Sequence, residues 1–189
     1  MKKVLFLLVV FVIVSGLILK GTFGYFSDDE TSAGSTFSAW QIVTVTLLND
    51  GFEGDPWDDK WDANGTIDWV QTSGEYHSGS YSALFHKDDT SLTSDDLDAS
   101  RAASITVSFW FRPHDLQAGS MFVQLYDGTT YDSWYNLMDY PGTQKDTWCY
   151  FSEDVTDSQY FRSDFRLRFD GSGLGKDFWL DDVLIKIER

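Results

Sequence analysis

The sequence predicts an all-β fold, an antiparallel β-sandwich behind an N-terminal signal or anchor helix, and three observations predict it. Short runs of β-branched and aromatic residues alternate with polar residues. Clusters of Asp, Gly, Ser and Asn separate the runs. Beyond the first 40 residues almost no segment has the residue pattern of an amphipathic helix that could connect parallel strands. Antiparallel strands joined by turns bury their apolar sides by packing two sheets face to face.

The predicted strands recur along one domain at residues 41–189. The run at 165–171 is the clearest, because Phe165, Leu167 and Phe169 fall on one side and Arg166 and Arg168 on the other. The complete set is 41–48, 67–71, 81–87, 104–112, 121–128, 131–139, 147–155, 165–171 and 177–187. Nine or ten strands at this spacing, with no low-complexity linker between them, indicate a single sandwich.

The first 24 residues have the parts of an export signal. Lys2 and Lys3 precede an apolar run at 4–19, and small residues follow it. The run is sixteen residues long, shorter than the roughly 20 that cross a membrane. We therefore expect cleavage between Gly24 and Tyr25 and a secreted, extracellular or cell-surface protein. An uncleaved N-terminal anchor is the alternative.

Charge and cysteine content describe the exported part. Cleavage leaves 11 basic and 30 acidic residues, a formal net charge of −19. Such a chain repels nucleic acid and anionic membranes and attracts divalent cations that take oxygen ligands. The single cysteine, Cys149, has no intramolecular partner, and its aromatic neighbours predict a buried, inert thiol.

No catalytic constellation is recognisable, and the sequence does not predict an enzyme. His77, His86 and His114 stand in separate segments without the spacing of metal ligands, and we expect them at the surface or at sheet edges. Adjacent carboxylates are frequent, but in so acidic a chain they indicate solvated loops rather than a glycosidase pair.

Two motifs at opposite ends of the domain carry a resemblance. The first is Gly51-Phe52-Glu53 with HSGSYSAL at 77–84, and the second is FWLDDV at 178–183. Their order resembles the jelly-roll carbohydrate-binding modules with a galactose-binding-like fold, over residues 49–187. In that group a structural calcium lies between the first and last strands. The resemblance implies Ca²⁺ ligands at Glu53 and at Asp181 or Asp182, with carbonyls near Gly51 and Ser78.

Electrostatics supports this expectation independently. Carboxylates brought together from opposite ends of a chain repel one another unless a cation lies between them, and Ca²⁺ prefers carboxylate and carbonyl oxygens. The alternative is that Glu53 and the Asp181–Asp182 pair are solvated residues that keep sheet edges from aggregating.

The junction after the apolar run carries a second resemblance. The segment GTFGYFSDDETSAGSTFSA at 21–39 is similar to the export junction of the TasA/camelysin group, filament-forming surface and biofilm-matrix proteins processed by a SipW-type peptidase. Gly24 replaces the usual Ala, and the motif GTLDL that normally follows Ala39 is absent. The resemblance implies this export route and a free N-terminal segment.

The segment at 25–40 is too polar to fold alone. Added as a strand to a neighbouring subunit's sheet edge, it would satisfy its backbone and seat Phe26 or Phe37 in pockets, with Tyr25 at its start. Head-to-tail donation that does not close would give a homopolymeric fibre. A disordered leader or an edge strand within the same chain is the alternative.

Sugar binding is the competing hypothesis. The chain holds eight tryptophans, and flat aromatic rings stack on sugars. Trp134 and Tyr135, beside Asp132 in a predicted hairpin, are the candidates for an exposed platform that binds polysaccharide. Asn64 in Asn64-Gly65-Thr66 is a possible glycosylation site. The sequence thus predicts a calcium-stabilised subunit of an extracellular filament or matrix, with a non-catalytic carbohydrate-binding module or surface adhesin as the alternative.

Overall fold

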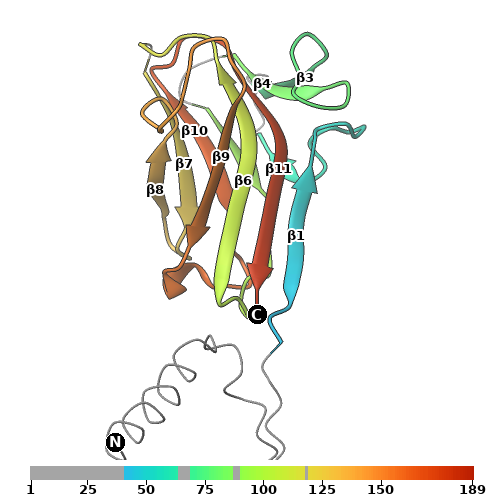
Figure 1. Ribbon diagram of the computed structural model, residues 1–189, viewed down its shortest axis with the longest axis vertical. Coiled ribbons are helices and arrows are strands. Elements are labelled where there is room, and N and C mark those ends of the chain that lie inside the picture. Colours follow the sequence, from blue (N-terminus) through green and yellow to red (C-terminus); the bar gives the residue numbers. More distant parts are fainter. Residues whose placement is uncertain (1–40, 64–68, 87–89, 118) are drawn as a thin grey trace, which may run out of the picture. The chain divides into compact units, whose positions relative to one another are not determined.

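The protein is an antiparallel β-sandwich of two sheets (Figure 1). The structure is a computed structural model that describes residues 41–63, 69–86, 90–117 and 119–189. Within these ranges it contains strands, turns and a short 3₁₀ helix at Ser158–Tyr160, but no α-helix. No helix in the described part of the chain is long and apolar enough to span a bilayer. The predicted fold class is confirmed for this part.

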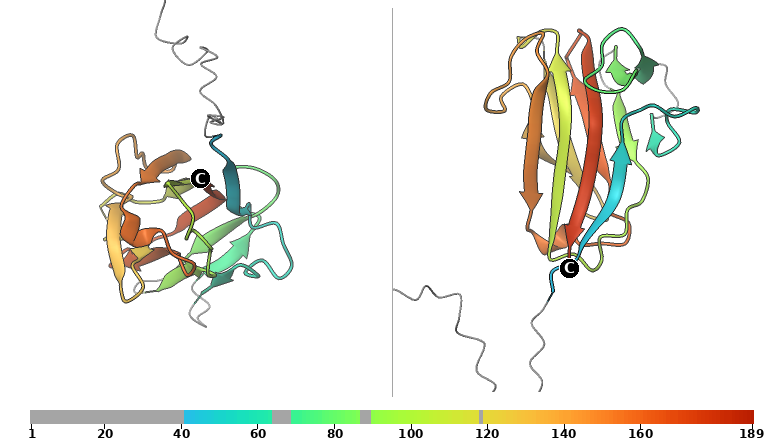
Figure 2. Two further views of the ribbon diagram at one scale, coloured as in Figure 1. Left: turned by 90° about the horizontal axis from the view of Figure 1, so that it is seen from below. Right: turned by 45° about the vertical axis from the view of Figure 1, so that its right-hand side comes forward.

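The first sheet has six strands arranged around β11 (Phe178–Glu188). The order β3-β4-β11-β6-β9 forms its main path, and β1 pairs with β11 as well. Its other strands are β1 (Thr44–Asp50), β3 (Trp69–Thr72), β4 (Ser82–Phe85), β6 (Ser104–Pro113) and β9 (Cys149–Val155). One edge of β11 pairs with β4 near its start and with β1 over the rest of its length, so these two strands lie end to end beside it (Figure 2).

The second sheet has five strands in the order β2-β5-β10-β7-β8. They are β2 (Trp61–Asp62), β5 (Ser91–Ser94), β7 (Ser120–Tyr126), β8 (Tyr131–Asn136) and β10 (Leu167–Ser172). The predicted alternation is present in β10, since Leu167 and Phe169 are fully buried whereas Arg166 and Arg168 are half-buried on the opposite side. The side of this sheet that faces away from the first sheet is therefore polar.

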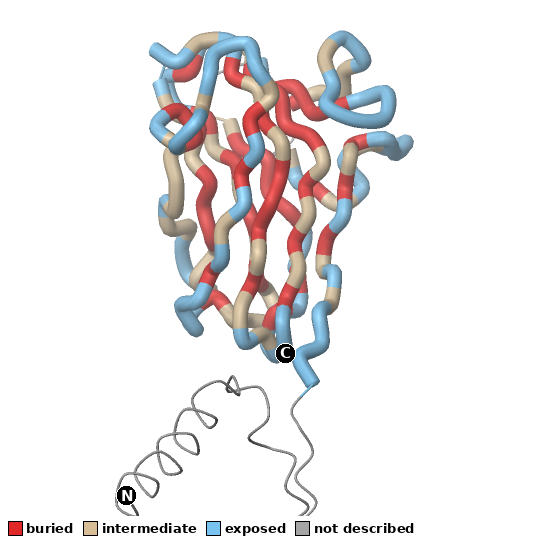
Figure 3. Tube along the Cα trace, in the orientation of Figure 1, coloured by how far each residue is buried: buried red, intermediate tan, exposed pale blue. Residues whose placement is uncertain are grey.

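Aromatic packing between the two sheets makes the core. Phe109 of β6 stacks on Phe151 of β9 at a centroid distance of 4.5 Å and meets Phe169 of β10 edge-on at 5.0 Å. Buried and more exposed residues alternate along the long strands (Figure 3), as expected where one side of each strand faces the core. Cys149 is a buried free thiol, as predicted.

Two of the described strands were not predicted. β5 reads SLTS and all four of its residues are buried, while β2 has only two residues. Three of these four residues are small and polar, so the segment is neither an apolar run nor an alternating one. The hydrophobic pattern therefore does not predict β5. These strands lie side by side at one edge of the second sheet, where they contribute to the site described below.

We expect Phe109→Ala to be among the most destabilising substitutions in the domain. The side chain is fully buried and contacts rings from both sheets, so its loss leaves a cavity that costs about 3–5 kcal/mol. Urea denaturation measures the loss. Tyr76→Ala is the control: this ring is 46% exposed, and its removal should change the free energy of unfolding by less than about 0.5 kcal/mol. Equal effects of the two substitutions would contradict the assigned core.

Candidate functional site

Three carboxylates from distant parts of the chain meet beside the loop that connects β3 to β4. Glu53 follows β1, while Asp181 and Asp182 lie in β11. An added Cβ on Gly51 would lie 3.4 Å from Asp182 Oδ1, 3.8 Å from Asp181 Oδ1 and 3.9 Å from Glu53 Cγ. The structure thus brings together Glu53, Asp181, Asp182 and Gly51, and Ser78 joins them through the hydrogen bonds described next.

Asp181 is the buried member of this cluster, with no exposed surface. Its Oδ2 accepts hydrogen bonds from the backbone N–H groups of His77 (2.7 Å) and Ser78 (3.1 Å), and its Oδ1 accepts one from the N–H of Asp182 (2.7 Å). Burial raises the pKa of Asp181 to about 6, although these N–H groups oppose the shift, and the charge of Asp182 adds to it.

Asp182 turns outward because the strand is irregular at this point. Its φ is +51°, and the pairing of β11 with β6 shifts between Asp181 and Leu184. Asp182 Oδ1 accepts a hydrogen bond from the Ser78 hydroxyl, and Oδ2 lies 2.7 Å from His77 Nδ1. The His77 ring in turn stacks on Trp110 at 3.9 Å, so an aromatic surface of the first sheet holds the loop in place.

Glu53 closes the cluster from the other side. Its Oε1 accepts hydrogen bonds from the N–H groups of Ser80 and Tyr81, each at 2.8 Å. Gly79 lies directly against this carboxylate with φ +66°, and a Cβ there would collide with Glu53 Oε1. Only glycine therefore allows both this backbone conformation and the close approach.

The chemistry of this cluster fits a cation. Among the described residues, no lysine or arginine forms an ion pair with Glu53, Asp181 or Asp182, and His77 is the one titratable donor that contacts the three carboxylates. No group of three His, Cys, Asp or Glu side chains in the described ranges is arranged to hold a metal alone. Backbone carbonyls would have to complete the ligand set, as is common for Ca²⁺.

A second set of polar residues crosses the outward side of the five-stranded sheet. The strand registers place one residue from each strand in a single row: Asp62, Thr93, Arg168, Gln124 and Ser133. Next to this row is a pocket of about 270 Å³, lined by Asp62, Thr93, Ser94, Asp95, Asp96, Tyr131, Arg166 and Arg168. Carboxylates, guanidinium groups, hydroxyls and one aromatic ring thus converge in one place.

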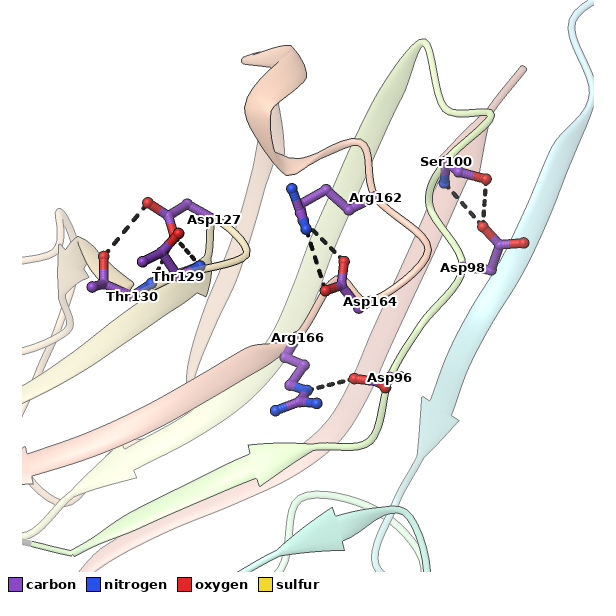
Figure 4. Close-up of polar contacts among 9 residues, drawn as sticks. All are labelled: Asp96, Asp98, Ser100, Asp127, Thr129, Thr130, Arg162, Asp164 and Arg166. Carbon is purple, nitrogen blue, oxygen red and sulfur yellow. Dashed lines mark hydrogen bonds and ion pairs between the residues drawn. The ribbon is translucent and has the colours of Figure 1, made fainter.

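The two arginines of this pocket are engaged with protein groups. Arg166 Nε donates a hydrogen bond to Asp96 (Figure 4), and hydrogen bonds to Asp96 and then to Tyr131 raise the pKa of Arg166. Arg168 Nε donates to Thr93 Oγ1 at 3.0 Å, and its Cζ lies 3.4 Å from the centre of the Tyr131 ring. Tyr131 belongs to β8, Arg168 to β10, and Arg166 directly precedes β10. Because β7 lies between β8 and β10, these side chains meet across β7.

Gln124 lies under this polar surface. It is 9% exposed, and its Nε2 donates to Asp170 Oδ2 at 3.2 Å and to Ser133 Oγ at 3.4 Å. Because a carboxylate only accepts, Asp170 fixes the orientation of the amide. Gln124 Oε1 is consequently a buried acceptor without a hydrogen-bond partner among the described residues.

The predicted sugar platform is not exposed as expected. Val123 pairs with Tyr135 and Gln124 with Ser133, so Trp134 is the extra residue of a β-bulge. The bulge interrupts the alternation, and both Trp134 and Tyr135 pack against Phe151, at 5.6 and 5.3 Å. The ring that borders the pocket is Tyr131, the first residue of β8, which the sequence interpretation did not select.

The remaining predicted residues divide into two groups. The expected cleavage site Gly24–Tyr25, the donor residues Phe26 and Phe37, and the sequon at Asn64 lie outside the described residues. The histidines do not form a joint site: His77, His86 and His114 each pair through Nδ1 with a different aspartate, namely Asp182, Asp177 and Asp146.

No protein-family model matches the sequence, and no curated protein matches it. The fold is similar to that of the CBM22-1 xylan-binding domain of Paenibacillus barcinonensis Xyn10C (14% identity, TM-score 0.56, 76% of this chain and 94% of that one). It is also similar to the C-terminal family 22 carbohydrate-binding module of Clostridium thermocellum Xyn10B (15%, 0.56, 75% and 92%). The K3 cleaved adhesin domain of Porphyromonas gingivalis Lys-gingipain is a further match (18%, 0.54, 76% and 99%). At these identities the similarity establishes the fold alone.

We expect Gly79→Ala to disrupt the carboxylate cluster. The added methyl group would collide with Glu53 and the positive φ would be strained, which together should cost at least about 1–3 kcal/mol in thermal or urea unfolding. Gly74→Ala in the same loop is the matched control, because its Cβ meets only Thr72 Oγ1 at 3.4 Å. If both variants unfold at the same midpoint, Gly79 does not hold Glu53 in place.

Proposed function

We propose that the domain is a non-catalytic polysaccharide-binding module and that the pocket beside Tyr131 holds the sugar. The observation that carries this proposal is the convergence of one aromatic ring with carboxylates, guanidinium groups and hydroxyls on the outward side of one sheet. Sugar sites combine these groups, since a ring stacks on the apolar side of a pyranose while polar groups bind its hydroxyls. Xylan-binding domains among the structural neighbours support the same conclusion.

The pocket offers a ligand two kinds of contact. The Tyr131 ring is supported by Arg168 at 3.4 Å and by Tyr126 at a centroid distance of 5.1 Å, so its position is fixed before a ligand arrives. Asp95 borders the same space, and its carboxylate would accept hydrogen bonds from hydroxyl groups. A rigid ring and a preplaced acceptor reduce the entropy lost on binding.

We assign the three-carboxylate cluster a structural role that is separate from sugar binding. Glu53, Asp181 and Asp182 would bind one Ca²⁺ together with nearby backbone carbonyls, and the ion would neutralise the buried charge of Asp181. This site joins the segment after β1 and the β3–β4 loop to β11. The proposed cation therefore stabilises the fold rather than contacting the ligand.

The proposed setting is extracellular. Adhesin and carbohydrate-binding domains among the structural neighbours support a surface-associated binding module better than a filament subunit. Self-association by donation of residues 25–40 stays a prediction, because these residues lie outside the described part of the chain.

Tyr131→Ala should weaken polysaccharide binding about tenfold or more while the domain stays folded. Affinity electrophoresis in gels that contain soluble xylan, followed by calorimetry with the polysaccharide that retards the protein, measures the effect. Tyr150→Ala, which removes a 50% exposed tyrosine from the other sheet, is the matched control and should bind normally. Retention of full affinity by Tyr131→Ala would refute the assignment of the pocket.

Calcium should raise the unfolding temperature of chelator-treated protein, and more so at pH 7 than at pH 5. The pKa of Asp181 is raised from 3.8 to about 6, so in the absence of a cation its contribution to stability is present below about pH 4 and is lost as the pH rises through 6. Ca²⁺ favours the ionised carboxylate and should offset this loss.

Asp181→Asn should abolish most of this calcium effect, whereas Asp139→Asn at an exposed carboxylate should preserve it. Differential scanning calorimetry with Ca²⁺ and with EDTA makes the comparison. An equal response of the Asp181→Asn variant and the unmodified protein would place the ion elsewhere.

A further inference from the structure

The pocket contains two arginines, a composition that would ordinarily suggest a site for acidic sugars. Each guanidinium group, however, donates a hydrogen bond to a protein side chain through its Nε. Arg166 is paired with Asp96 and lies over the Tyr126 ring at 5.3 Å, and Arg168 is bonded to Thr93 and lies against Tyr131. The charge of Arg166 is thus paired with a carboxylate, and the guanidinium of Arg168 lies against the Tyr131 ring.

The lining of the pocket is acidic. Its three aspartates, Asp62, Asp95 and Asp96, outnumber its two arginines, and the whole chain carries a formal net charge of −16. Carboxylates such as Asp95 accept hydrogen bonds from hydroxyl donors, whereas a carboxylate on the ligand would meet like charge.

From these contacts we propose that the pocket selects uncharged stretches of polysaccharide and rejects uronic acid units, with Asp96 as the specificity-determining residue. Asp96 disfavours an acidic sugar because it pairs with Arg166, and because the three aspartates of the lining, Asp62, Asp95 and Asp96, outnumber its two arginines. Arg168 acts as a positioning residue, since it holds the Tyr131 ring. This inference rests on the proposed function and names the ligand class of that site.

The first experiment measures the affinity of the unmodified chain for two sets of oligosaccharides of equal length. The neutral set is xylohexaose, cellohexaose and laminarihexaose, and the acidic set is glucuronic acid-substituted xylohexaose, oligogalacturonate and oligoguluronate. The best neutral ligand should bind at least about tenfold more tightly than any acidic one, and the difference should narrow at high salt. Binding to none of the six overturns the proposed function, whereas equal binding to both sets overturns only the inference.

The second experiment frees Arg166. Asp96→Asn should raise the affinity for acidic relative to neutral oligosaccharides by about tenfold, because the guanidinium can then pair with a ligand carboxylate. Asp154→Asn makes the same change of charge on β9 of the other sheet and should leave the ratio unaltered. An unchanged ratio in a folded Asp96→Asn protein contradicts the role given to Asp96.

A third pair of variants separates positioning from direct binding. Arg168→Met should weaken binding of the neutral ligand, and Arg168→Lys should restore much of it, since an ammonium group still interacts with the Tyr131 ring. Loss of binding in both variants would mean that the guanidinium itself contacts the sugar, which overturns the positioning role.

Discussion

Packing of aromatic rings between the two sheets is the interaction on which the rest of this domain depends. The one cysteine is a free thiol, so no intramolecular disulfide reinforces the described fold, and rings such as Phe109, Phe151 and Phe169 must hold the sheets together. Each strand consequently commits one side to the core. The opposite side of the five-stranded sheet is left free to carry Arg168, Gln124 and their neighbours, and it is this free side that forms the proposed sugar site.

The carboxylate cluster has a different role, because it holds the long loop between β3 and β4, which has no regular secondary structure. Backbone N–H groups at residues 77, 78, 80 and 81 all point at carboxylates, so the loop between β3 and β4 is held by charged acceptors rather than by a strand partner. The cost is a concentration of negative charge, including the fully buried Asp181. A bound cation would offset that cost, and the same residues would then hold both the loop and the proposed calcium ion.

Sequence patterns predicted the architecture, because local alternation marks most of the strands. The motif order also pointed to Glu53, Asp181 and Asp182, which the structure places together, and their role as calcium ligands stays a prediction. The long strands at 104–113 and 178–188 were found almost to the residue. The proposed sugar site could not be found in this way. The row beside its pocket combines one residue from each of five strands, including the unpredicted β2 and β5, and depends on their registers. The choice of Trp134 and Tyr135 was wrong as an exposed platform, because a one-residue bulge changes which side of the sheet a ring occupies, and nothing in YDSWYN marks that bulge.

Because β11 pairs with three strands of the six-stranded sheet, this sheet cannot form before β11 is made. Among the described strands, β1 pairs only with β11, and β4 reaches β6 only through it. A growing chain that ends before Phe178 therefore holds a separate β3–β4 hairpin and a separate β6–β9 pair, with an unpaired β1. The six-stranded sheet closes only after β11 is made, whereas all the strands of the five-stranded sheet precede β11 in the chain. Late closure of this sheet is compatible with the export that the sequence predicts.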